Sequence, residues 1–213
     1  MSRFHPSPDV LMAYAAGSLP EPRALLIATH LSLCADCRDA AKEMEAVGGA
    51  LLDRLAPAEI APDALDRLLE RLDEPAPPKA PPPPADPVLP APLRAYVGRG
   101  IDGVAWTKLG GGVEEFRLPI PTTGSYATRL IRIGAGRRIP SHSHDGDELT
   151  LVLAGGFTDG DDHYGRGDVA GADPSVNHHP VADADGDCIC VVVTQGKLRF
   201  SGPLGPLLTY FRG

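Results

Sequence analysis

The chain has 213 residues, 43% of them apolar and only 5% aromatic, which suits one large or two small domains with Leu, Val, Ala and Ile cores. Its formal net charge is −8, so it lacks the basic footprint that direct DNA binding requires. No apolar run approaches the roughly 20 residues of a membrane span, and the N-terminus lacks the apolar stretch of a signal peptide. We therefore expect a cytoplasmic protein whose four cysteines are metal ligands or redox-active thiols rather than structural disulfides.

The negative charge is concentrated in the first part of the chain. Residues 1–92 hold 8 Lys+Arg and 14 Asp+Glu, a net of −6, and residues 93–213 hold 12 and 14, a net of −2. An acidic N-terminal module suits a basic protein partner, including one that itself binds DNA. The alternative, that the charge serves solubility alone, stays open.

Helix signals dominate the first third of the chain. Predicted helices run from Pro8 to Ala16, from a Ser18–Glu21 capping box to about Leu33, from about Asp36 to Leu52, and from Pro62 to Leu72. Gly48 and Gly49 could bend or break the third of these. The fourth has one apolar stripe, which either packs on its own domain or binds a partner; the stripe consists of Leu65, Leu68, Leu69 and Leu72.

A metal-binding pattern lies at the junction of the second and third predicted helices. His30 and Cys34 are four apart on a helix and should share a face, and Cys37 follows at the spacing of zinc knuckles. His5, the only other histidine in the first 140 residues, is the predicted fourth ligand of a structural zinc. The alternative is a surface CxxC with unrelated histidines; a thioredoxin-like role is disfavoured because no βαβ pattern surrounds the motif.

Residues 75–92 form a proline-rich linker, in which 10 of the 18 positions are Pro. Such a segment favours an extended polyproline spacer, reaching roughly 55 Å at about 3.1 Å per residue. The predicted organisation is therefore a helical domain over 1–74, the linker over 75–92, and a second domain over 93–213. We expect the linker to hold the two domains apart.

From Leu93 onward helix patterns stop and short strand patterns alternate with Gly turns, which is typical of an all-β sandwich or jelly roll. The fold class is therefore α+β, with a small all-α domain followed by an all-β barrel. The clearest predicted strands are Ser125–Ile133, Glu148–Leu153, Cys188–Thr194 and Lys197–Phe200.

A second metal-binding pattern lies in this half. His142 and His144 are two apart on a strand and face the same way, and Glu148 shares their parity. His178 follows a turn and strand that open at Gly167-Asp168, and completes a three-His, one-carboxylate set for a divalent first-row ion. The neighbouring His179 is the alternative fourth ligand; His163, in a Gly/Asp turn, is interpreted as a surface residue.

The remaining cysteines, Cys188 and Cys190, share one face of a predicted strand, a position poorly suited to a disulfide between them. They are interpreted either as two small buried residues or as an oxidisable thiol pair near the metal.

Taken together, the motifs resemble a known family. Gly136-x5-His142-Ser143-His144-x3-Glu148-x6-Gly155 resembles the cupin signature, and His5 with His30-x3-Cys34-x2-Cys37 resembles a zinc-binding anti-sigma domain. Nearly the whole chain is similar to ChrR-type anti-sigma factors. That resemblance implies zinc in both domains, with the ligand sets derived above, and a group IV (ECF) sigma factor as partner, bound in a 1:1 complex.

In this family the helical domain keeps the sigma factor from core RNA polymerase, and the cupin domain is needed for its release in response to singlet oxygen or organic hydroperoxide. The sequence thus predicts a non-enzymatic, cytoplasmic regulator that binds neither nucleic acid nor membrane. The alternative function is a metal-dependent cupin dioxygenase to which the zinc knuckle is an appendage.

Overall fold

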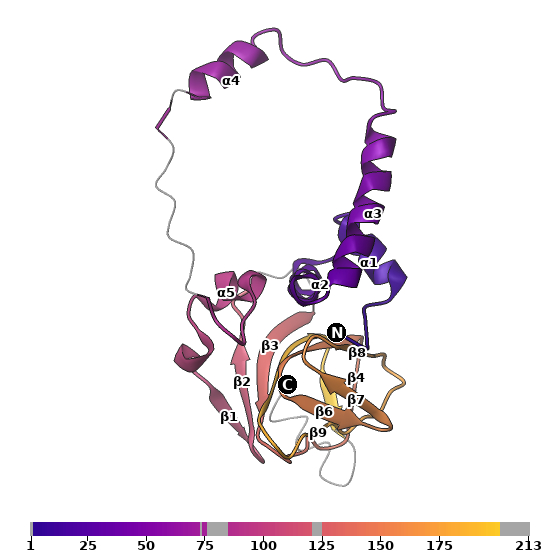
Figure 1. The fold of residues 1–213 in the computed structure, drawn as a ribbon, viewed down its shortest axis with the longest axis vertical. Coiled ribbons are helices and arrows are strands. Elements are labelled where there is room, and N and C mark those ends of the chain that lie inside the picture. The colour runs from indigo at the N-terminus through magenta and orange to yellow at the C-terminus, as the bar shows by residue number, and fades with distance from the viewer. Residues whose placement is uncertain (1, 73, 76–84, 121–124, 201–213) are drawn as a thin grey trace.

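The computed structural model describes residues 2–72, 74–75, 85–120 and 125–200 (Figure 1). Helices come first and antiparallel strands follow, as predicted, and the two halves lie against each other. None of the helices in these ranges is long and apolar enough to cross a bilayer.

Three helices form the N-terminal body: α1 (Pro8–Ala15), α2 (Glu21–Leu33) and α3 (Ala35–Leu52). Ser7 precedes α1, as predicted, and Gly17 with φ +67° ends it in the left-handed region that glycine tolerates. The predicted capping box is wrong: Pro20 is the N-cap residue of α2, and the Ser18 hydroxyl donates to the Ala13 carbonyl instead. The helix α3 runs through Gly48 and Gly49 without a break.

The end of α3 and the separate helix α4 (Ala64–Leu72) project away from this body (Figure 1). We call residues 45–72 the helical arm. Nearly every residue of the arm is exposed, including its large apolar side chains: Val47, Leu51, Leu52, Leu55, Ile60, Leu65, Leu68, Leu69 and Leu72. The apolar stripe of α4 therefore does not pack on its own domain.

A fifth helix, α5 (Ala91–Val97), corrects the expectation that helices stop at Leu93. It straddles the predicted domain boundary, a short 3-10 turn at Ile101–Gly103 follows it, and its Tyr96 hydroxyl donates to Glu21 of α2 (2.6 Å). Leu89, inside the predicted linker, is fully buried, so the last part of the linker is packed rather than extended in solvent. Residues 76–84, the centre of the predicted polyproline spacer, lie outside the described residues.

The C-terminal half is a cupin-like arrangement of antiparallel strands. Three sheets have the orders β1-β2-β3-β10-β5-β8, β7-β6-β9 and β11-β4. The strands are β1 (Thr107–Gly110), β2 (Val113–Arg117), β3 (Tyr126–Ile133), β4 (His142–His144), β5 (Glu148–Ala154), β6 (Gly156–Asp159), β7 (Asp162–Gly165), β8 (Val169–Ala172), β9 (Val181–Ala182), β10 (Cys188–Gln195) and β11 (Leu198–Phe200). The four strands predicted most clearly agree with β3, β5, β10 and β11 to within one residue at each end.

One hydrophobic core runs through both halves. Helix α2 packs on the six-stranded sheet, where Leu26 and Ile27 share a buried cluster with Leu151 and Val191 (Figure 1). The opposite face of the same strands lines a cavity. Because these strands are covered on both faces, β5 and β10 are almost continuously apolar in sequence. The expectation that the linker holds the two domains apart does not hold for α1–α3, because α2 contacts β3, β5 and β10 while α1, α3 and α5 contact α2.

Candidate metal centres

The chain brings the four side chains of the first metal pattern together. His30 lies in the last turn of α2, Cys37 in the first turn of α3, and Cys34 between them with extended backbone (φ −114°, ψ 113°). Cys34 thus does not follow His30 along a continuous helix, as the spacing suggested. The chain breaks at Cys34 and turns back toward the site. His5 reaches the same point from the N-terminal segment, so that the four ligand atoms lie within 4.8 Å of one another.

The geometry fits a tetrahedral zinc ion. His5 Nδ1 lies 3.5 Å from Cys34 Sγ and 3.2 Å from Cys37 Sγ. Zinc with ordinary Zn–S and Zn–N bond lengths would place tetrahedral N and S ligands about 3.6 Å apart. The His30 Nε2 atom is buried and lacks a hydrogen-bond partner, which a metal bond would supply.

The electrostatics of the cluster favour a bound cation. Burial, together with the neighbouring Cys34 thiol, raises the pKa of Cys37 to about 12, so the apoprotein holds this thiol protonated at neutral pH. Burial also lowers the pKa of His30 and keeps its imidazole neutral. A zinc ion in the site would reverse the preference of Cys37 by stabilising the thiolate. The donor set therefore suits a structural Cys2His2 zinc.

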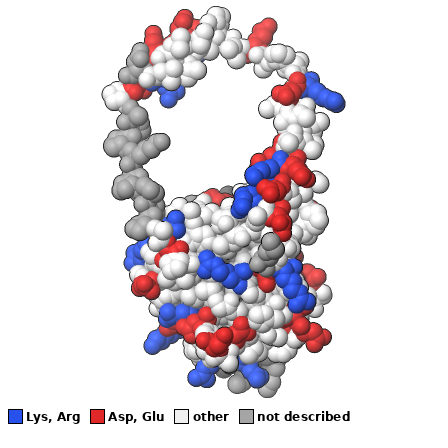
Figure 2. All heavy atoms as spheres, in the orientation of Figure 1, with Lys and Arg blue, Asp and Glu red and all other residues white. Residues whose placement is uncertain are grey.

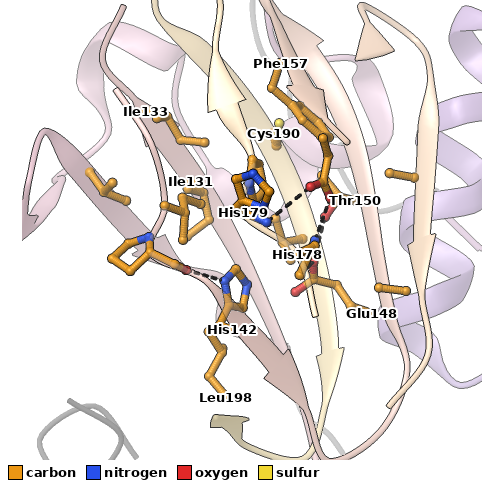
Figure 3. Close-up of a pocket in the computed structure, with 18 of the residues that line it drawn as sticks. Ile131, Ile133, His142, Glu148, Thr150, Phe157, His178, His179, Cys190 and Leu198 are labelled. Atoms are coloured by element: carbon orange, nitrogen blue, oxygen red, sulfur yellow. Dashed lines mark hydrogen bonds and ion pairs between the residues drawn. The ribbon is translucent and has the colours of Figure 1, made fainter. Parts of the chain in front are cut away.

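The second metal pattern assembles inside the β half. His142 and His144 project from β4, Glu148 begins β5, and His178 lies in the loop between β8 and β9. His142 and His178 exchange both backbone hydrogen bonds, each 3.0 Å, which fixes the loop against β4. Figure 3 shows the side chains of His142, Glu148 and His178 on the wall of the cavity.

The ligand atoms of this set lie at metal-site separations. His144 Nε2 is 3.0 Å from His178 Nε2 and 3.3 Å from Glu148 Oε2, and His178 Nε2 is 3.9 Å from Glu148 Oε1. Nitrogen ligands at right angles around a first-row ion would be about 3.0 Å apart. The three imidazoles form the tight cluster, with Glu148 at its edge. Three His and one carboxylate on such an ion leave coordination positions open toward the cavity.

Burial also tunes these ligands. Desolvation, followed by the neighbouring imidazoles, lowers the pKa of His142 and His144 to about 4, so both rings are neutral at physiological pH. Desolvation raises the pKa of Glu148 to about 7. A divalent cation needs neutral imidazoles, which His142 and His144 already are, and an ionised carboxylate, which Glu148 becomes by losing its proton.

A carboxylate that the sequence analysis missed supports His178. Asp159 at the end of β6 lies with Oδ2 2.9 Å from His178 Nδ1, while its Oδ1 accepts the backbone N–H of His179 at 3.1 Å. This carboxylate accepts from Nδ1–H and leaves the Nε2 lone pair of His178 for a metal, as second-sphere carboxylates do. His179 is exposed and outside the cluster, which favours His178 as the ligand. No sequence signal links Asp159 to the site.

The cavity beside this cluster is about 770 Å³ and mostly apolar. Figure 3 places Ile131, Ile133, Phe157 and Leu198 on its wall together with the histidines. Its size is within the range of small-molecule sites, so the candidate metal faces a space that can admit an organic molecule.

Cys188 and Cys190 lie on β10, both buried and both unbridged, with their sulfurs 3.5 Å apart. The Cys188 thiol and burial raise the pKa of Cys190 well above its usual value, which favours the protonated thiol over the thiolate. Cys190 lines the cavity. His163 is exposed, as expected, and pairs with Asp183 at 3.0 Å.

Comparison with known proteins adds three findings. A family model described as "ChrR Cupin-like domain" matches residues 97–198. The anti-sigma-E factor ChrR of Cereibacter sphaeroides is 45% identical over 209 residues, covering 98% of this chain and 97% of the relative. A chain in the crystal structure of Rhodobacter sphaeroides SigE in complex with the anti-sigma ChrR is 44% identical, with a TM-score of 0.83 over 92% of this chain and 100% of that chain.

A fold likeness of lower degree involves enzymes. A putative acetylacetone dioxygenase of Methylibium petroleiphilum PM1 is 18% identical, with a TM-score of 0.43 over 49% of this chain and 80% of that chain. A likeness at this level is no indication of dioxygenase activity.

Proposed function

The chain belongs to the ChrR family of anti-sigma factors, and from this premise we propose that it binds a group IV (ECF) sigma factor in a 1:1 complex. Its helical half would hold the sigma factor and keep it from core RNA polymerase. The complex would act in the cytoplasm, where the polymerase works. The observation that carries the proposal is the helical arm, whose apolar side chains have no packing partner within the described residues.

The character of the arm supports a protein partner. Its nine large apolar residues are 50% to 77% exposed, an arrangement that marks an interaction surface. Figure 2 shows charged side chains of both signs along α3 and the arm, and residues 36–72 hold nine Asp+Glu against five Lys+Arg, a net of −4. Amphipathic helices with this pattern bind grooves on other proteins, and their net charge suits a basic surface.

The zinc knuckle would serve as the structural clamp of this half. His5, His30, Cys34 and Cys37 are the proposed ligands, and one zinc would tie the N-terminal segment to α2 and to the start of α3. This link would fix the orientation of α3 and therefore of the helical arm that continues from it. Structural zinc also contributes directly to the free energy of folding.

The cupin half would detect the signal, singlet oxygen or an organic hydroperoxide. His142, His144, Glu148 and His178 are the proposed ligands of a second metal, with zinc as the expected ion, and the cavity beside them could admit an organic molecule. The thiols of Cys188 and Cys190 are a second candidate for the oxidised group. We propose no catalytic reaction for this half.

The proposed function is tested by co-purification and runoff transcription with a group IV sigma factor of the same organism. The wild-type chain should form a stable 1:1 complex and abolish transcription from the cognate promoter. Cys34→Ala and Cys37→Ala should each lose one zinc per chain and lose inhibition, whereas Cys188→Ala should retain both. Normal transcription in the presence of the wild-type chain would refute the proposal.

The sensing role has its own test in the same assay. His142→Ala and Glu148→Ala should inhibit transcription as the wild type does but fail to release the sigma factor when oxidant is added. A normal oxidant response by both variants would show that the second metal site has no part in sensing. Oxygen uptake by the iron-loaded wild type would point instead to the alternative function, a dioxygenase.

A further inference from the structure

The N-terminal segment that carries His5 is anchored on the β half rather than on the helices. The backbone N–H groups of Arg3 and Phe4 donate to Oδ1 of Asp168, at 2.5 Å and 3.0 Å. Val169 N–H donates to the Phe4 carbonyl at 3.0 Å, so the segment continues the edge of the sheet beside β8. The Phe4 ring also packs on Tyr164 of β7, with ring centroids 4.5 Å apart.

This anchor determines the position of one zinc ligand. His5 directly follows Phe4, and its own side chain is exposed. Within the described residues, the hydrogen bonds and the ring contact of the His5 side chain are all with the other three candidate ligands. The attachment of residues 3 and 4 to the sheet therefore holds the backbone from which its imidazole reaches the thiols. Asp168, only 6% exposed, is the buried acceptor at the centre of this attachment.

A second ligand is oriented by the same turn. His30 Nδ1 lies 2.8 Å from the Gly167 carbonyl oxygen. A carbonyl only accepts, so Nδ1 carries the proton and Nε2 presents its lone pair to the metal position. Gly167 has φ +92°, a backbone conformation that residues with a Cβ rarely adopt, so the turn favours glycine.

The turn is also tied to the cupin ligands. Gly167 N–H donates to the carbonyl of Val152 on strand β5, and Val152 N–H donates to the carbonyl of Asp168. At the other end of β8, Ala172 pairs with Glu148, the first residue of the same strand. Three residue steps, about 10 Å, separate Val169 from Ala172. One short strand thus touches the surroundings of both candidate metal sites.

We propose that the Gly167–Asp168 turn and β8 form an outer support of the knuckle, so that the cupin half positions two of its four zinc ligands, His5 and His30. Metal retention by the knuckle then depends on the conformation of the cupin half. A shift of β8 would loosen both histidines at once while leaving the two thiols in place. The consequence for sigma-factor release rests on the proposed function; the support of the metal site does not.

Cobalt(II) is a selective probe of this support in the full chain. A sulfur-to-cobalt charge-transfer band arises only where thiolates bind the metal, and the His142, His144, Glu148 and His178 set contains none. Phe4→Ala removes the ring contact with Tyr164 by changing a residue of the N-terminal segment and none of the β strands. Asp168→Ala removes the acceptor itself. Asp173→Asn is the matched control, because the Asp173 carboxylate caps only its own loop, through Ser175, at the far end of β8.

Phe4→Ala and Asp168→Ala should weaken cobalt binding at the thiolate band about 10-fold, the lower end of the cost of losing a partner that orients a metal ligand, because both act on His5 through the backbone. Asp173→Asn should match the wild type. Circular dichroism and Trp106 fluorescence check folding; if Asp168→Ala is unfolded, Phe4→Ala decides. Folded Phe4→Ala that binds cobalt within twofold of the wild type would overturn the proposal. Sigma-factor binding by the wild type, measured in parallel, reports on the proposed function separately.

Discussion

At the residue scale, both candidate metal sites orient their imidazoles in the same way, by a hydrogen bond from the ring nitrogen that faces away from the metal position. In each of three histidines the outer nitrogen is held by a fixed oxygen: His30 by the Gly167 carbonyl, His142 by that of Pro140, and His178 by Asp159. Each oxygen accepts from Nδ1–H, which leaves the Nε2 lone pair for a metal. The ligand types could be read from sequence, whereas the oxygens that orient them come from other loops and strands.

The raised pKa of Glu148 predicts a pH dependence of metal binding. In the metal-free chain Glu148 is protonated below its pKa of about 7, so an incoming cation must displace a proton. His142 and His144, with pKa values of about 4, are already neutral and add no slope. Affinity at the cupin site should thus rise about tenfold per pH unit from pH 5.5 to 7 and level off above.

Manganese(II) added to the chain loaded with a single zinc at the knuckle, followed by paramagnetic resonance, measures this affinity, because manganese prefers nitrogen and oxygen ligands to thiolates. Glu148→Gln is the control and should bind more weakly with little slope below pH 7. If affinity changed with pH equally in the variant and the wild type, the proton displaced by the metal would come from a group other than Glu148.

Asp159 should be a positioning residue of the cupin site. Its two oxygens accept from both His178 Nδ1 and the His179 backbone, and an Asn side chain has only one acceptor oxygen. We expect Asp159→Asn to lower manganese affinity about 10- to 100-fold. Asp161→Asn, at an exposed position of the following turn, should change nothing. Wild-type affinity in Asp159→Asn would show that His178 needs no such partner.

At the scale of elements, α4 stands apart because none of the described residues covers its apolar side. Leu65, Leu68, Leu69 and Leu72 follow the 3.6-residue period, and all are exposed. The sequence left two uses of this stripe open, and the position of α4 away from the body removes packing on its own domain (Figure 1). A helix this short has little stability alone in water, so contact with a partner should stabilise it.

The double substitution Leu68→Glu/Leu69→Glu should weaken sigma-factor binding at least tenfold, because it puts charge into the centre of the proposed contact. Stability of the chain should not change, since both side chains are exposed. Arg67→Ala, on the opposite side of the helix, is the matched control and should bind normally. Calorimetric titration supplies the affinities, and wild-type affinity of the double variant would remove α4 from the interface.

At the scale of the molecule, the helices α1–α3 and the sheet share one core. Leu26, fully buried on α2, belongs to the same cluster as Leu151 and Val191 of the sheet. A conformational change in the β half therefore need not cross the proline-rich linker to reach the knuckle. It can pass through the packed face and the Gly167–Asp168 turn.

A shared core predicts cooperative unfolding of the two halves. Helical circular dichroism, which reports α1–α3, and the fluorescence of Trp106, which precedes β1, should show coincident transitions in denaturant. Leu26→Ala should lower the free energy of unfolding by about 3 kcal/mol in both signals. Leu55→Ala, 68% exposed on the arm, should leave it unchanged. Two separate transitions in the wild type would show that the halves fold independently.

Local patterns were sufficient to predict the order of helices and strands, the ends of four strands to within one residue, and which His and Cys side chains cluster: His5, His30, Cys34 and Cys37, and His142, His144 and His178. These properties depend on residue type and on spacing along a few turns or one strand, which a sequence displays directly. The same locality explains the errors at Ser18–Glu21 and at Leu93, where capping and packing outweighed the local signal.

Only the tertiary structure decided which groups from distant segments meet. Three such contacts join different elements, and no spacing in the sequence predicts them. They are Asp159 with His178, Gly167 with His30, and Asp168 with the residues before His5. The same is true of the sheet covered by α2 and of the uncovered arm. Burial and long-range hydrogen bonds are properties of the packed chain, because each depends on how all the helices and strands pack together and not on the residues next to it in sequence.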